Sequence, residues 1–275
     1  NFPCHLTSLE RNNSKFSADF PYYAEESLIN KFNNDDFVML YLNGPCGNLC
    51  QVDVKNSETF EVGDQHSRRA GRKFADAVNK IINNCILLDD NSDINTVYSE
   101  IEIPIREITE KMIDDAKKII EKNKGKVIKE FELSNYGLES YKDNTVISAQ
   151  KLLETEFWEN MSANEIINLS KAYKNNKKEV VPLTVAKIGS ILIIAVPAEL
   201  FVEYSLNFKN IFKEKYKNII VVELANGWVG YVPTRKAFLY NSGYEVQFLS
   251  SSKLHEDAGD IITKEIIQME KRLRQ

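Results

Sequence analysis

The stretch from residue 180 to residue 196 constrains the fold most, because it is apolar almost throughout and contains a single turn. Residues 181–188 and 191–196 are strand-length runs rich in valine and isoleucine, and Gly189–Ser190 separates them. Two such runs joined by a tight turn predict a β-hairpin. A further apolar run over residues 218–224 is bounded by polar residues, which predicts a buried strand.

The remaining segments predict further strands and several helices. A helix is expected from about Ala198 to Tyr216, because Pro197 suits a helix start and Glu199 would then lie in the first turn. Residues 37–42 form a continuous apolar run, which predicts a buried strand. Residues 95–104 alternate and end at a proline, which predicts a half-buried strand near a sheet edge. Helices are predicted near 22–32, 66–88, 109–124, 148–160, 162–175 and 260–274. We therefore predict an α/β fold, a mixed β-sheet flanked by helices, in a single domain over residues 1–275.

The composition excludes two classes of partner. The chain has 275 residues and a formal net charge of −5, so it lacks the basic surplus expected of a nucleic-acid-binding protein. No apolar run approaches the ~18 residues of a membrane span. The acidic balance also argues against strong attraction to anionic membranes. The chain begins at Asn1 without an initiator methionine or a signal-peptide pattern, so we expect a fragment or one half of a processed precursor. The sequence does not indicate the cellular compartment of the protein.

The segment from Ala225 to Glu245 is too apolar for an ordinary solvated loop, and its glycines and Pro-Thr pair argue against a helix. It directly follows the predicted strand 218–224, and segments at strand ends commonly carry function. The alternative is a packed loop in which Trp228 and Tyr231 fill the core.

Other chemically capable groups follow predicted strands. The glycine-rich loop of residues 43–50 would let the backbone approach a ligand at Gly44 and Gly47. A histidine, His5, and a carboxylate, Glu199, from separate strand ends are donors that zinc accepts. Each also has a structural interpretation, as a packed histidine and as a carboxylate in the first turn of a helix.

The four cysteines, Cys4, Cys46, Cys50 and Cys85, are too few for a disulfide scaffold and lack zinc-finger spacing. Cys46 and Cys50 are close enough in sequence to pair or to bind a metal, or they are small buried residues.

Five segments in order resemble the neutral/alkaline ceramidase family, in the second part of its catalytic domain. The family patterns are N-F-x-x-H-x-T, S-[AS]-D, a strand running into a glycine loop, P-[GA]-E, and G-Y-[VL]-x-T followed by Y-E. The matching segments here are Asn1–Thr7, Ser17–Asp19, Leu42–Asn48, Pro197–Glu199, and Gly230–Thr234 with Gly243–Glu245.

The resemblance implies one zinc ion, with His5, Glu199 and Tyr231 among its ligands. Tyrosine is an unusual zinc ligand, and the alternative role for Tyr231 is that of an electrophile. The resemblance also places Tyr244 near the scissile carbonyl as a hydrogen-bond donor and implies that Gly44, Gly47 and Trp228 contact substrate. Asp19 would orient a metal ligand as a neighbouring carboxylate, or it would only cap the helix that begins near Tyr22.

Two departures from the family pattern affect these expectations. The family's other zinc histidine belongs to an earlier H-x-H segment that this chain lacks, so a separate N-terminal chain or segment would have to supply it. Cys50 stands where the family's G-D-x-S-P loop has a serine, so a nucleophilic role there stays open.

The sequence thus supports a zinc-dependent amide hydrolase that acts on an N-acyl bond in a lipid or small metabolite. The alternatives are a non-catalytic binding or scaffold chain on the same fold, and a different hydrolase such as an esterase or peptidase.

Overall fold

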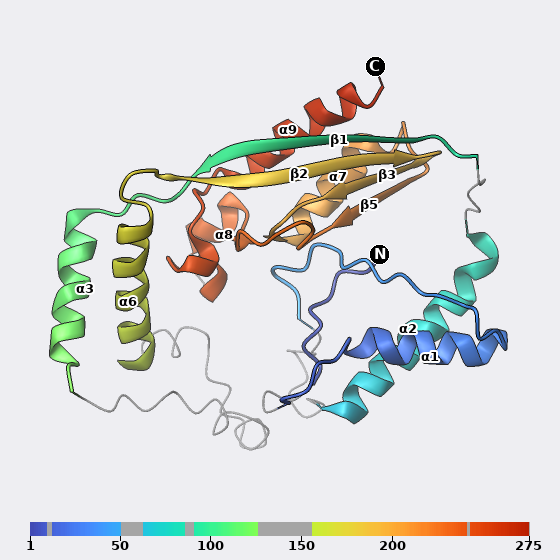
Figure 1. Cartoon of the computed structure of the whole chain (residues 1–275), viewed down its shortest axis with the longest axis horizontal. Helices are drawn as coiled ribbons and strands as arrows, with labels where there is room; N and C mark the ends of the chain where they lie inside the picture. The colour runs from blue at the N-terminus through green and yellow to red at the C-terminus, as the bar shows by residue number, and fades with distance from the viewer. Residues whose placement is uncertain (10–12, 51–62, 86–90, 126–155, 241–242, 275) are drawn as a thin grey trace.

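A computed structural model describes residues 1–9, 13–50, 63–85, 91–125, 156–240 and 243–274 (Figure 1). The helices are α1 (Phe20–Phe32), α2 (Asp64–Ile81), α3 (Glu110–Lys122), α6 (Glu156–Ala172), α7 (Val202–Phe212), α8 (Arg235–Tyr240) and α9 (Ala258–Arg272). The strands are β1 (Ile94–Pro104), β2 (Lys178–Ile188), β3 (Ile191–Ala195), β4 (Glu199–Leu200), β5 (Asn218–Val222) and β6 (Tyr231–Val232). Among these residues, no helix is both long enough and apolar enough to cross a bilayer.

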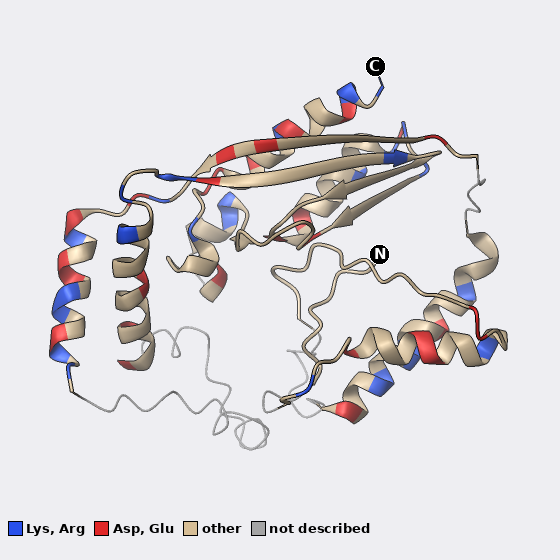
Figure 2. Cartoon of the chain, in the orientation of Figure 1, with Lys and Arg blue, Asp and Glu red and all other residues tan. Residues whose placement is uncertain are grey.

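The central sheet has four strands in the order β1-β2-β3-β5. Strands β1, β2 and β3 pair antiparallel, whereas β5 returns parallel to β3 after α7. The sheet is therefore mixed, and the predicted fold class, hairpin and edge strand are confirmed. Figure 2 shows that charged residues lie mainly on the helices and on strands β1 and β2, while β3 and β5 carry none.

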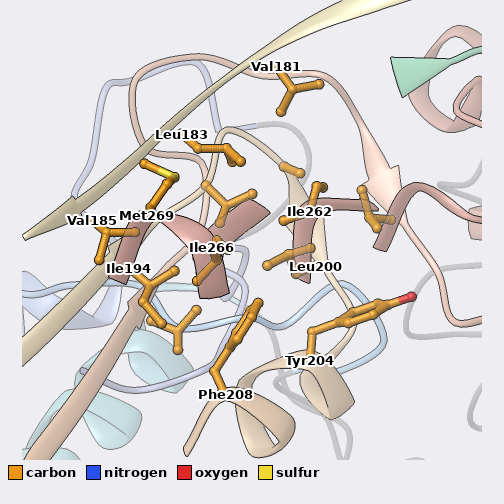
Figure 3. Close-up of a cluster of buried hydrophobic side chains, with 14 of the residues drawn as sticks. Val181, Leu183, Val185, Ile194, Leu200, Tyr204, Phe208, Ile262, Ile266 and Met269 are labelled. Carbon is orange, nitrogen blue, oxygen red and sulfur yellow. The ribbon is translucent and has the colours of Figure 1, made fainter. Parts of the chain in front are cut away.

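The core fills the space between one face of this sheet and helices α7 and α9 (Figure 3). Alternate β2 residues point inward, because successive side chains of a strand face opposite sides. Phe208 of α7 and Ile266 of α9 are fully buried against them. Burial of such side chains contributes about 1.5–3 kcal/mol each. The labelled part of this core comprises Val181, Leu183, Val185, Ile194, Leu200, Tyr204, Phe208, Ile262, Ile266 and Met269.

Two helix pairs extend from the sheet. Helices α1 and α2 pack on each other below the sheet edge in Figure 1, and α3 and α6 form a second pair beyond the ends of β1 and β2. The sequence predicted a helix boundary between residues 160 and 162, which is wrong because α6 runs unbroken across it. Much of the helix predicted over 148–160 lies outside the described residues.

Residues 37–42 do not form the buried strand that their apolar run predicted. Val38 and Leu40 are 81% and 78% exposed, and the segment ends in an isolated bridge between Phe2 and Asn43. A strand needs a partner to satisfy its backbone groups, and no described strand lies alongside these residues.

The helix predicted to begin at residue 198 starts later, at Val202. Glu199 and Leu200 instead form β4, which pairs parallel with β6. The Glu199 N–H donates to the Gly230 carbonyl at 3.0 Å, so this carboxylate belongs to a strand rather than to a helix turn. The aromatic segment also includes one helix that its composition argued against, α8.

Candidate functional site

The N-terminal segment, the loop of residues 43–47 and the ends of strands β4 and β5 meet at one place. The Phe2 N–H donates to the Leu42 carbonyl at 3.2 Å, and the Glu223 N–H donates to the Asn43 carbonyl at 3.1 Å. The Asn1 side chain reaches the Val221 carbonyl at 2.9 Å. The bonds to Val221 and from Glu223 join segments at least 180 residues apart in the sequence, and all three bonds fix the position of the adjoining His5 segment.

Gly47 packs directly against strand β4. Its N–H donates to the Leu200 carbonyl at 2.8 Å. A Cβ atom at this position would lie 2.5 Å from the Glu199 carbonyl oxygen, which is closer than real atoms approach. The glycine therefore allows the loop to reach the strand that carries Glu199. Gly44 has more room, with its nearest neighbour, the Pro3 nitrogen, 3.1 Å from a Cβ.

Glu199, Trp228, Tyr231 and Tyr244 form a polar group on the short β4–β6 sheet. The Trp228 indole N–H donates to Glu199 Oε1 at 2.9 Å. The Tyr231 and Tyr244 hydroxyls lie 2.8 Å apart, and their rings meet edge to face. Trp228 is 53% exposed, so it does not fill the core as one interpretation expected, whereas Tyr231 is buried.

Both phenols of this group keep their protons at neutral pH. Burial raises the pKa of Tyr231 far above its ordinary value, and the hydrogen bond with Tyr244 and the charge of Glu199 add to this rise. Burial also raises the pKa of Tyr244. Tyr244 is partly exposed, so its hydroxyl can act as a hydrogen-bond donor toward a molecule that enters from the surface.

Glu223, directly after β5, is a buried carboxylate that the sequence analysis did not single out. It is 2% exposed, and Oε2 accepts from the Cys46 N–H at 3.0 Å. Oε1 accepts from Asn43 Nδ2 at 3.1 Å and from the Cys46 thiol at 2.8 Å. Burial raises the pKa of Glu223 to about 7, and the Glu199 carboxylate favours the same direction.

A signal for Glu223 existed in the sequence. A carboxylate directly follows an uninterrupted β-branched run, yet we included it in the predicted strand 218–224 without giving it a role.

His5, Cys46 and Glu223 come together as a cluster whose nitrogen, sulfur and oxygen donor atoms all lie within 4.8 Å of one another. His5 is partly buried and the other two are buried. Burial and the adjoining Glu223 raise the pKa of the Cys46 thiol. Zinc accepts all three donor types. The chemistry of this donor set therefore fits a zinc ion.

Asp19 caps α1 and organises the chain after His5. Its carboxylate accepts from the Phe20 N–H at 2.6 Å and from the Ser8 N–H at 2.8 Å. The helix-cap interpretation is thus confirmed. Within the described part of the chain, no hydrogen bond joins Asp19 to the His5 ring. The Asp19 carboxylate instead accepts from the backbone N–H groups of Ser8 and Leu9.

The cysteines of the glycine loop lie in different surroundings. Cys46 is fully buried, as one interpretation expected, while Cys50 is exposed and lies close to Cys4. Cys50 also lines a cavity between the N-terminal segment, α1 and α2.

Known proteins resemble this chain in structure but not in sequence. No protein-family model matches the chain, and no curated protein matches it in sequence. The structure is similar to that of the neutral ceramidase from Pseudomonas aeruginosa, with a TM-score of 0.60 and 15% identity over 98% of this chain. It is also similar to a ceramidase complexed with C2, with a TM-score of 0.62 and 16% identity over 99% of this chain.

The aligned part spans 42% and 45% of those two proteins, which is less than half of each. At this identity the comparison shows a ceramidase-like fold.

Proposed function

We propose that the chain acts as a zinc-dependent amide hydrolase that cleaves an N-acyl bond, with a lipid amide of the sphingolipid type as the substrate class. The observation that carries this proposal is the gathering of Glu199, Tyr231 and Tyr244 beside the His5–Cys46–Glu223 cluster. The fold similarity to ceramidases supports it.

His5, Glu199 and Tyr231 are the proposed zinc ligands, and Cys46 and Glu223 are further donors within the same region. When bound, zinc would lower the pKa of a water molecule and polarise the amide carbonyl. The Trp228 N–H holds the Glu199 carboxylate through Oε1. The Asn43 side chain and the Cys46 N–H hold Glu223 in the same way.

Tyr244 is proposed to donate its hydroxyl proton as a hydrogen bond to the oxyanion that develops on the amide carbonyl. Its raised pKa keeps the donor protonated, and its partial exposure leaves it accessible to substrate. Removal of such a donor typically lowers kcat by about 10²–10³-fold. The exposed Trp228 ring would contact the substrate beside it. Gly44 and Gly47 are proposed to let the loop backbone approach the substrate, because both lie in the loop that carries Cys46.

Cys50 is exposed next to the site, and water rather than this thiol is the proposed nucleophile. Cys50→Ser should therefore retain most of the activity. A loss comparable to that of Glu199→Gln would instead identify the thiol as a reacting group.

The proposal includes one more histidine ligand from a separate N-terminal chain or segment. Of the chain's three histidines, His5 lies in the cluster, whereas His66 lines the cavity at α2 and His255 lies beside Asp257. Intact-mass analysis of the protein purified from its own source would test for such a chain. A complete site with only this polypeptide present would remove that part of the proposal.

The direct test is hydrolysis of a fluorogenic N-acyl amide by the zinc-loaded protein. Glu199→Gln should lower the rate at least ~100-fold, whereas the exposed control Glu214→Gln should leave it unchanged. Hydrolysis that is indifferent to zinc and to Glu199→Gln would overturn the proposal. No hydrolysis in the presence of zinc and of any copurifying chain would favour a binding protein.

A further inference from the structure

A cavity of about 500 Å³ lies between the N-terminal segment, α1 and α2, beside the candidate site. Small-molecule sites are concave, mostly apolar and on the order of 300–1,000 Å³ in volume. This cavity is connected to the candidate site through Asn43. Asn43 Oδ1 accepts from the N–H of the lining residue Cys4 at 3.4 Å, and Asn43 Nδ2 donates to Glu223.

The walls of the cavity are predominantly apolar. Phe2 and Phe74 meet with ring centroids 5.4 Å apart, and Phe20 lies 6.2 Å from Phe74. Ala70, Phe74 and Ala77 follow the i, i+4, i+7 spacing, so one stripe of α2 forms a continuous wall. Such walls suit a flexible hydrocarbon chain better than a polar metabolite.

Two cations border this apolar wall. Arg69 and Lys73 also line the cavity, are exposed, and lie one helical turn apart on α2. The basic residues of this helix are visible in Figure 2. Arg69 Nη2 also lies 3.5 Å from Nδ1 of His66, another lining residue. Arg68 pairs with Asp64 at 2.7 Å and does not line the cavity.

We propose that this cavity binds one fatty acid, with the hydrocarbon chain along the Phe2–Phe74 wall and the carboxylate between Arg69 and Lys73. The inference stands on the cavity and does not depend on the proposed function. It also complements that function, since hydrolysis of an N-acyl bond in a lipid amide releases a fatty acid.

The test is equilibrium titration of the full chain with a dansyl-labelled undecanoic acid in the presence of EDTA. Dodecanoate and dodecanol then serve as competitors of equal chain length. The expected result is saturable binding of one probe, displaced more strongly by dodecanoate than by dodecanol. Because EDTA removes metal, this result is independent of zinc binding and of amide hydrolysis.

Two sets of variants separate the apolar wall from the cations. Ala70→Phe should weaken binding of both competitors at least tenfold, because the larger side chain fills the cavity. Arg69→Gln/Lys73→Gln should weaken dodecanoate binding roughly three- to tenfold and leave dodecanol binding unchanged. The control, Arg72→Gln/Lys80→Gln, removes two exposed charges of α2 that do not line the cavity and should bind both competitors as the unmodified chain does.

Circular dichroism and thermal unfolding identify any variant that fails to fold. If Ala70→Phe does not fold, the charge variant and its control still decide the question. The absence of saturable binding to the folded unmodified chain would overturn the proposal. The proposal would also be overturned if Arg69→Gln/Lys73→Gln and the control variant changed dodecanoate binding by the same factor.

Discussion

Two buried glutamates lie in contrasting surroundings. Glu270 of α9 is fully buried, and its oxygens accept from Tyr216 at 3.0 Å, from Lys215 at 3.1 Å and from Arg274 at 2.9 Å. Glu223 is 2% exposed, and the groups of Asn43 and Cys46 that donate to its carboxylate are uncharged. Both carboxylates are hydrogen-bonded, but only the negative charge of Glu270 is paired with the positive charges of lysine and arginine side chains.

The difference supports a structural role for Glu270 and makes Glu223 a candidate for a functional role. A buried charge that cations neutralise is consistent with the packing of α9, whereas desolvation without a cation raises the pKa of Glu223 to about 7. Strongly perturbed carboxylates cluster at functional sites. A bound cation such as zinc would supply the compensation that Glu223 lacks.

The largest expected effect concerns the pH dependence of stability in the metal-free protein. Because the pKa of Glu223 is raised on folding, its contribution to stability is fully present below pH ~4.5 and is lost as the pH rises through about 7. Relative to Glu223→Gln, the unmodified chain should lose about 2–3 kcal/mol of unfolding free energy between pH 4.5 and 8. Urea unfolding of both proteins across this range measures the difference. Parallel pH profiles would show that Glu223 is not perturbed.

Glu270→Ala should destabilise the protein by about 2 kcal/mol, because Tyr216 loses a buried partner and α9 loses packing. Lys215 and Arg274 are 42% and 50% exposed, so both cations can return to water and the loss stays moderate. Urea unfolding at pH 7 checks this value against the exposed control Glu214→Ala. A change below 0.5 kcal/mol, or a loss of zinc binding, would contradict the structural assignment of Glu270.

The sequence predicted the long strands of the sheet better than the short elements around the candidate site. Residues 181–188, 191–196 and 218–224 repeat apolar residues over whole elements, so β2, β3 and β5 could be predicted from pattern alone. Strand β4 has only two residues and depends on pairing with β6, whose residues lie 32 positions further along, so no local pattern distinguishes it from a helix start. Residues 37–42 show the opposite failure. Their apolar pattern predicted a strand, but no described strand pairs with the segment, and its side chains at 38 and 40 are exposed.

The candidate site was predicted in part. The Glu199–Tyr231 and Tyr231–Tyr244 neighbours follow from the motifs that resemble ceramidases, and the structure places these residues together. The contact between Glu223 and Cys46 could not be predicted from the sequence. Their proximity depends on hydrogen bonds between segments 177 residues apart.

Gly47→Ala should lower the free energy of unfolding by about 1–3 kcal/mol, because the new Cβ would clash with the Glu199 carbonyl oxygen beside the candidate site. Gly44→Ala, with its nearest contact at 3.1 Å, should cost less and serves as the matched control. Thermal unfolding and zinc titration of both variants test this order. Equal effects would mean that the close approach of the loop to β4 is not important.

Trp228→Phe should have the smallest effect on stability, about 0.5–1 kcal/mol, since the indole is half exposed and loses one hydrogen bond to Glu199. Amide hydrolysis should fall several-fold, because Glu199 is held less firmly. A separate measurement of kcat and KM locates the loss. A Trp228→Phe protein with unchanged kinetics would show that this hydrogen bond does not position Glu199.

The most direct test of a metal site beside Glu223 is an anomalous difference map, recorded at the zinc absorption edge from crystals of the protein grown with zinc. We predict a single strong peak within coordination distance of His5 and of at least one carboxylate, Glu199 or Glu223. Further contacts to Tyr231 or to Cys46 would decide which donors complete the ligand set. Peaks confined to surface residues, with none at His5, would contradict the account.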